Sequence, residues 1–128
     1  MSSDKTVRQH IIDELTPNLP AEWRIEDGIP TLGTLSKPVL WIEYTELAPL
    51  EGAPLSHIAA SADLCIATNQ TDMRKAEDAA DEHVAALYEA AFAAGSFYAI
   101  SAKKTVFNDQ YLGWRMSITV ALQKPTKE

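Results

Sequence analysis

The sequence predicts an α+β fold: a mainly antiparallel sheet of about four strands with two helices packed on one face. Two segments repeat apolar residues at helical spacing, and four others have the alternation or the β-branched and aromatic content of strands. They follow one another in the order helix, strands, helix, strands. The chain has 128 residues, 46% of them hydrophobic, which is enough for one core. We therefore expect a single domain over residues 1–128, with 124–128 as a polar tail.

The first helix is predicted from Asp4 to Leu15. Apolar residues recur there on one helical face, and Asp4 suits the positive end of the helix dipole. Pro17 and Pro20 end the helix, because proline lacks the N–H group that a helix interior needs. We expect Trp23–Ile25 to form a short extended piece before a loop.

Two long strands are predicted next, over Val39–Thr45 and Ser56–Ala67. In the first strand, Leu40 and Ile42 lie on the same face, as period-two alternation requires. The segment Leu47–Leu55 between the strands has two prolines and a glycine and keeps neither the helical nor the strand period. We therefore expect a protruding loop, with the second strand returning beside the first as a hairpin partner.

The second helix is predicted from the N-cap Thr71, with Asp72 just inside the helix, to a C-terminal cap at Gly95. A single apolar stripe supports it. The stripe consists of Met73, Ala76, Ala80, Val84, Leu87, Tyr88 and Ala91.

The last two strands are predicted over Ser96–Phe107 and Tyr111–Gln123, joined by a turn at Asn108 and Asp109. The final strand alternates clearly. Its inward side chains are Trp114, Met116, Ile118, Val120 and Leu122, and its outward ones include Arg115, Ser117, Thr119 and Gln123.

Charge and cysteine content exclude several classes of protein. Eleven basic and eighteen acidic residues give a formal net charge of -7, which disfavours general binding to nucleic acid or to an anionic membrane. No apolar run approaches the roughly 18 residues of a membrane span, and the first fifteen residues do not form a secretory signal. Cys65 is the sole cysteine, so the chain has no internal disulfide and no cysteine-rich metal site. We expect a soluble protein that is not exported.

No constellation of residues indicates catalysis or a cofactor. The glycines are too far apart for a phosphate-binding loop, and His10, His57 and His83 lie in unrelated segments. Cys65 lies within an apolar strand, where a packed and unreactive thiol is the better interpretation. We therefore expect no enzymatic activity, no cofactor and no metal.

An acidic group on the second helix has two interpretations. Glu77 and Asp81 are one turn apart, as are Asp78 and Glu82, and like charges at this spacing are unfavourable. A solvated helix face is the simpler interpretation. A docking patch for a basic partner is the alternative, and the four carboxylates are its candidate contact residues.

The predicted loop Leu47–Leu55 is the other candidate contact. Its apolar residues either fold back onto the sheet or present an apolar tip to a neighbouring subunit. For the second case the candidate residues are Leu47, Leu50, Glu51 and Leu55. We predict that the loop becomes ordered on assembly.

The arrangement resembles the tail terminator proteins of long-tailed bacteriophages, in particular the small forms from phages of actinobacteria. The resemblance rests on order and spacing over almost the whole chain. The residues that carry it are the opening helix followed by Leu19, Pro20, Ala21, Glu22, Trp23 and Arg24; Leu35, Ser36, Lys37, Pro38 and Val39; Thr71 with Ala76, Glu77, Asp78, Ala79, Ala80 and Asp81; and Ala102, Lys103, Lys104, Thr105, Val106 and Phe107 with Tyr111, Leu112 and Gly113. The Ile29–Ser36 loop and the junction at Gly95, Ser96 and Phe97 depart from the pattern.

The resemblance implies a structural virion protein made in the host cytoplasm and located at the head–tail junction. Six copies would form a ring that caps the tail tube, ends tail polymerisation and meets the head-completion, or stopper, protein. DNA would pass through the channel without specific binding, which suits an acidic chain. Three alternatives remain open: another neck or tail-completion subunit, a tail-tube subunit, and a small α+β ligand-binding domain.

Overall fold

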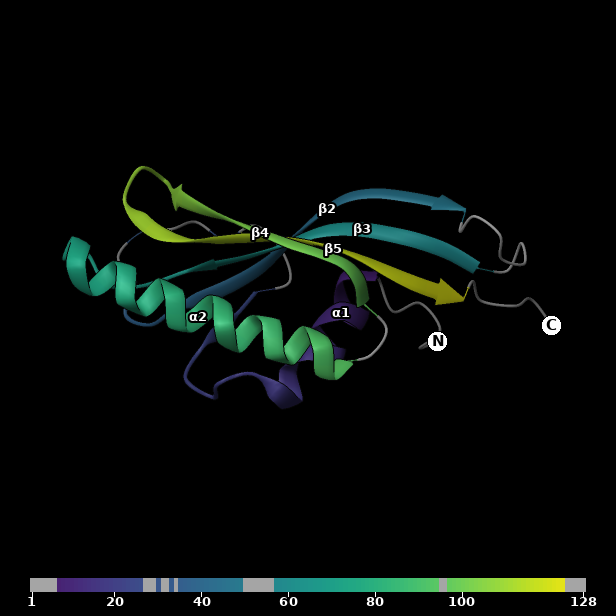
Figure 1. Ribbon diagram of the computed structural model, residues 1–128, viewed down its shortest axis with the longest axis horizontal. Helices are drawn as coiled ribbons and strands as arrows, with labels where there is room; N and C mark the ends of the chain where they lie inside the picture. The colour runs from purple at the N-terminus through teal and green to yellow at the C-terminus, as the bar shows by residue number, and fades with distance from the viewer. Residues whose placement is uncertain are drawn as a thin grey trace.

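The computed structural model describes residues 7–26, 30, 33, 35–49, 57–94 and 97–123 (Figure 1). Its elements are α1 (Val7–Leu15), the short 3-10 helix η2 (Thr16–Asn18), β1 (Arg24–Ile25), β2 (Val39–Pro49), β3 (His57–Ala67), α2 (Met73–Ala94), β4 (Phe97–Phe107) and β5 (Tyr111–Gln123). The α+β class is confirmed. The sheet has five strands instead of about four, because the extended piece near Trp23 pairs with the sheet as β1.

The strand order in the sheet is β1-β2-β3-β5-β4. β1 runs parallel to β2, and the other pairs are antiparallel. The predicted hairpin pairing of the first two long strands is thus confirmed. Both helices lie on one side of the sheet, with α2 running along it and α1 beside α2 (Figure 1). β3 and β5 occupy the centre, and β4 forms one edge.

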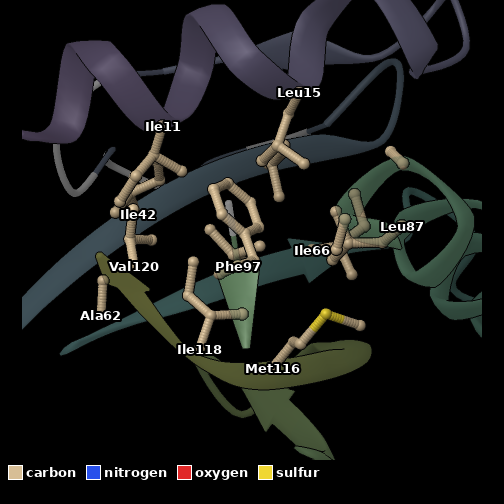
Figure 2. Close-up of a cluster of buried hydrophobic side chains, with 14 of the residues drawn as sticks. Ile11, Leu15, Ile42, Ala62, Ile66, Leu87, Phe97, Met116, Ile118 and Val120 are labelled. Atoms are coloured by element: carbon tan, nitrogen blue, oxygen red, sulfur yellow. The ribbon is translucent and has the colours of Figure 1, made fainter. Parts of the chain in front are cut away.

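The main core lies between the helices and the sheet (Figure 2). α1 contributes Ile11 and Leu15, and α2 contributes Leu87; all three side chains are fully buried. They meet the alternate strand residues that face the helices, which is the pattern that the sequence predicts. The strand residues labelled in Figure 2 are Ile42, Ala62, Ile66, Phe97, Met116, Ile118 and Val120.

A second apolar cluster lies on the opposite, helix-free face of the sheet. It contains Leu35, Val39, Trp41, Cys65, Ala67, Phe107 and Tyr111. The rings of Trp41 and Phe107 meet edge to face, with centroids 4.9 Å apart. The Tyr111 hydroxyl donates a hydrogen bond to the Gly33 carbonyl and accepts one from the Leu35 amide. These bonds hold the chain before β2 over this end of the sheet, which is therefore buried on both faces.

β2 is longer than predicted. It continues past Thr45 to Pro49, so residues 47–49 belong to a strand and the loop interpretation is wrong for them. The register shifts between Tyr44, opposite Ala62, and Glu46, opposite Ser61, leaving Thr45 as an extra residue. Such a bulge reverses the phase of the alternation, and for this reason the sequence pattern is lost at this point. Residues 50–56 lie outside the described part of the chain.

The other element boundaries follow the predictions with one correction. α1 ends at Leu15, and Pro17 lies in η2, while residues 4–6 lie outside the described part. Asp72, not Thr71, is the N-cap of α2: its Oδ1 accepts a hydrogen bond from the Arg74 amide, and its carbonyl accepts one from Ala76. Aspartate is as good a cap as threonine, so the two adjacent candidates look alike in the sequence.

The predicted turn between β4 and β5 is confirmed. Asn108 and Asp109 have φ angles of 56° and 54°, and the Gln110 amide donates to the Phe107 carbonyl. Two successive positive φ angles are typical of hairpin turns, and asparagine and aspartate adopt them at the lowest cost after glycine. The predicted cap Gly95 and the tail 124–128 lie outside the described residues.

Candidate functional site

The acidic residues of α2 are exposed, which agrees with the interpretation that they form a solvated helix face. Glu77, Asp78, Asp81 and Glu82 are all exposed. Asp81 forms an ion pair with Lys104 of β4 at 3.3 Å, and the Lys104 ammonium also lies 5.4 Å from the centre of the Trp114 ring. Part of the acidic charge therefore joins α2 to the edge strand. The docking role of these residues remains a prediction.

The structure describes one of the four candidate residues of the predicted loop. Leu47 lies in β2, where its backbone is opposite Ala60 of β3. Leu50, Glu51 and Leu55 lie outside the described residues. The proposal that this segment contacts another subunit therefore stays a prediction, and it applies to a segment that begins after Pro49.

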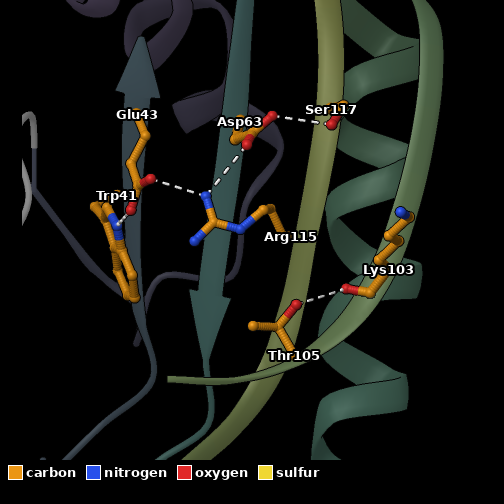
Figure 3. A network of polar contacts seen from close by, with 7 residues as sticks. All are labelled: Trp41, Glu43, Asp63, Lys103, Thr105, Arg115 and Ser117. Atoms are coloured by element: carbon orange, nitrogen blue, oxygen red, sulfur yellow. Dashed lines mark hydrogen bonds and ion pairs between the residues drawn. The ribbon is translucent and has the colours of Figure 1, made fainter. Parts of the chain in front are cut away.

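A polar network on the helix-free face was not predicted as a unit (Figure 3). The Nη1 atom of Arg115 donates to Oε1 of Glu43 at 2.8 Å and to Oδ2 of Asp63 at 3.2 Å. Trp41 Nε1 donates to the other Glu43 oxygen at 2.9 Å, and Ser117 Oγ donates to Asp63 at 2.9 Å. Three adjacent strands, β2, β3 and β5, are thus joined through side chains.

The network is only partly shielded from solvent. The side chains of Arg115, Glu43 and Asp63 are 33%, 26% and 18% exposed. Burial raises the pKa of Glu43, but hydrogen bonds from Arg115 and Trp41 outweigh this effect and hold the pKa below its ordinary value. The hydrogen bond to Glu43 likewise raises the pKa of Arg115. Two carboxylates share one guanidinium, so the three groups carry a net charge of -1.

Cys65 lies beside this network and is fully buried. Burial raises the pKa of its thiol to about 12, and the nearby carboxylates add to the effect while Arg115 opposes it. A thiol with this pKa is protonated at neutral pH and is a poor nucleophile. The expected packed, unreactive thiol is consistent with this environment.

Sequence alternation indicates the faces of the network residues but does not bring them together. Arg115 is predicted to point outward, and period-two alternation places Glu43 and Asp63 on the faces opposite to Ile42 and Leu64. The strand register brings them together. Glu43 of β2 is opposite Asp63 of β3, and Arg115 of β5 is opposite Cys65, which is two residues from Asp63 along β3. Sequence alternation gives the face of each residue but not its height along the neighbouring strand.

Among the residues that the structure describes, no three histidine, cysteine, aspartate or glutamate side chains are grouped so that they could hold a metal ion. The described helices include none that is long and apolar enough to cross a membrane.

No family model matches the sequence, and no curated protein matches it either.

Proposed function

We propose that the protein is a structural subunit that forms a ring on the tail tube of a long-tailed bacteriophage. In this role it ends tube polymerisation and joins the tail to the head-completion protein, as the resemblance to tail terminators implies. The ring is proposed to have six subunits and to lie at the head–tail junction of the virion. DNA crosses its channel without specific binding.

One structural observation carries the assembly role: the sheet has two long and different edges. Among the described residues, β4 pairs only with β5, and β2 pairs only with β3 beyond Leu40. Each edge offers backbone N–H and C=O groups to a further strand. A subunit with two different edges can bind a copy of itself at each, which is the requirement for a ring.

The charge of the chain supports the second part of the proposal. Each subunit has a formal net charge of -7. A channel built from such subunits repels phosphates, which favours the passage of DNA over its retention. The same charge makes the subunits repel one another, so we expect closed rings to be favoured by salt and by contact with a tube end.

The test is the length of tail tubes assembled with and without the protein. Tubes should have a defined length, with a ring at one end, when the protein is present, and should be longer when it is absent. Electron microscopy measures both properties. Decoration along the sides of tubes, or tight binding to DNA at physiological salt, would contradict the proposal. Stacking of the purified protein into long tubes would identify a tube subunit instead.

A further inference from the structure

The edge strand β4 and the part of β2 beyond Leu40, which β1 does not cover, carry opposite charge. β4 contains Lys103 and Lys104 and no acidic residue, while β2 contains Glu43 and Glu46 and no basic residue. Lys103 and Lys104 are exposed. Because the two edges lie on opposite sides of the sheet, the subunit is electrically polar in the direction across its strands.

The helix-free face shows the same polarity strand by strand (Figure 3). Glu43 of β2 is opposite Asp63 of β3, and Arg115 of β5 is opposite Lys103 of β4. From β2 to β4, the charged side chains are therefore acidic, acidic, basic and basic, and Arg24 of β1, beyond β2, forms an ion pair with Glu26. The ion pairs of Arg115 join the two halves within the subunit, whereas no ion pair between described residues involves Lys103.

We propose that β4 of one copy pairs with β2 of the next copy, so that one sheet continues from subunit to subunit. This inference rests on the proposed ring and identifies the contact that builds it. β4 runs antiparallel to β5, β5 to β3 and β3 to β2, so β4 and β2 run in opposite directions. Copies related by rotation about an axis close to the strand direction keep this relation. The new pairing is therefore antiparallel.

Within this seam, Lys103 of one copy lies near Glu43 of the next. Both residues belong to the helix-free face. Within one subunit, the cross-strand partners lead from Glu43 through Asp63 and Ser117 to Ser101 of β4, and Lys103 lies two residues further along β4. A stagger of two residues between copies brings the two charges opposite each other. A stagger between strands is what a closed, tilted sheet requires.

Charge selects this pairing over the alternatives. Two β4 edges in contact would oppose lysines, and two β2 edges would oppose glutamates, and like charges directly opposite each other are destabilising. Only the mixed contact joins opposite charges. It is also a head-to-tail contact, which closes into a ring where the rotation allows and leaves neither edge exposed.

Cross-linking between single-cysteine additions tests the contact. One variant carries Lys103→Cys and the other Glu46→Cys, on a β2 residue opposite Ser61 and therefore away from the Arg115 network. A short, flexible bismaleimide should join the two variants when they are mixed under ring-forming conditions, and neither variant to itself. The unmodified chain is the control, because its Cys65 is buried.

The outcomes separate the seam from the function. Self-linking of Lys103→Cys, or visible rings whose mixed variants do not link, would overturn the seam while leaving the ring intact. Tubes that grow past their normal length with the unmodified protein present would instead overturn the proposed function.

A charge reversal gives a second measurement. Lys103→Glu should raise the protein concentration for half-maximal ring formation about ten-fold. Lys75→Glu is the matched control, because it makes the same charge change at an exposed site in the first turn of α2. Circular dichroism verifies that both variants fold. Equal assembly of the two variants would contradict the seam.

Discussion

The indole ring of Trp23 meets the imidazole ring of His83 edge-on, with ring centroids 5.4 Å apart and an interplanar angle of 82°. Through this contact, the segment after η2 packs against the middle of α2. The Nε2 atom of His83 is buried and has no hydrogen-bond partner among the described residues. Burial lowers the pKa of His83, and the charges of Glu82 and Glu22 oppose this effect only in part. The fold therefore holds the imidazole in its neutral form.

This environment predicts a loss of stability in mild acid. The unfolded chain takes up a proton at His83 near the ordinary pKa of about 6.5, whereas the folded chain does so only at lower pH. The stability that comes from keeping His83 neutral is thus fully present above the pKa of the unfolded chain. It is lost as the pH falls from that pKa to the lower pKa of the folded chain. Urea unfolding at pH 7.5, 6.5 and 5.5 measures it. His83→Phe should flatten this dependence, and the control His10→Gln should retain it; equal slopes in all three proteins would contradict the prediction.

Gly113 is predicted to tolerate no side chain. A Cβ atom built on it would lie 1.9 Å from the carbonyl oxygen of Ile66, a backbone atom of the adjacent strand. Gly113→Ala must therefore move β5 away from β3 and should lower the free energy of unfolding by about 2–3 kcal/mol. Gly33→Ala is the matched control, because its Cβ would meet nothing within 4 Å. Similar unfolding midpoints for the two variants would contradict the close approach of the strands.

Tyr111→Phe should loosen the segment before β2 and leave the aromatic cluster in place. The change removes the hydroxyl that binds the Gly33 carbonyl and the Leu35 amide while keeping the ring. We expect a loss of about 1 kcal/mol. Hydrogen exchange should accelerate at the Leu35 amide and remain unchanged at the centre of β3. Uniform acceleration throughout the sheet would indicate a global effect instead.

Arg115→Met should destabilise the protein at neutral pH and much less in acid. At pH 7 it leaves Glu43 and Asp63 close together without their shared cation, at an expected cost of about 1–2 kcal/mol for partly exposed groups. The pKa of Glu43 is lower in the folded than in the unfolded chain. The stability that its ion pair with Arg115 provides is therefore present above the pKa of the unfolded chain and disappears as the pH falls through the pKa of the folded chain. The stabilities of variant and parent should therefore converge as the pH falls below the ordinary pKa of a glutamate in urea titrations. Ser117→Ala, which removes one exposed bond to Asp63, should have a much smaller effect.

The architecture was predictable where the sequence repeats one period without interruption. β5 shows this best: its bounds, Tyr111 to Gln123, agree with the prediction, and its inward residues Met116, Ile118 and Val120 are buried. The order of elements and the helix stripe sufficed for the α+β class. Met73 is the exception in the stripe, since it is the first residue of α2 and is 65% exposed.

The candidate site was less predictable, because it depends on register. Residues Glu43, Asp63 and Arg115 are far apart in the chain and meet through three strands. Likewise, the ion pair between Asp81 and Lys104 joins a helix to a strand, and helical spacing alone relates Asp81 only to residues of its own helix. The two-residue strand β1 is too short to show any period, and its place beside β2 is a tertiary contact.

The extra residue in β2 makes this strand unusually permissive of a change in length. Tyr44 is opposite Ala62 and Glu46 is opposite Ser61, so a chain lacking Thr45 would retain every cross-strand partner and resume unbroken alternation. A deletion at Leu40 or Ile42 would instead turn core residues towards the helix-free face. Related chains that differ in length within this strand are therefore expected to gain or lose their residue at Thr45.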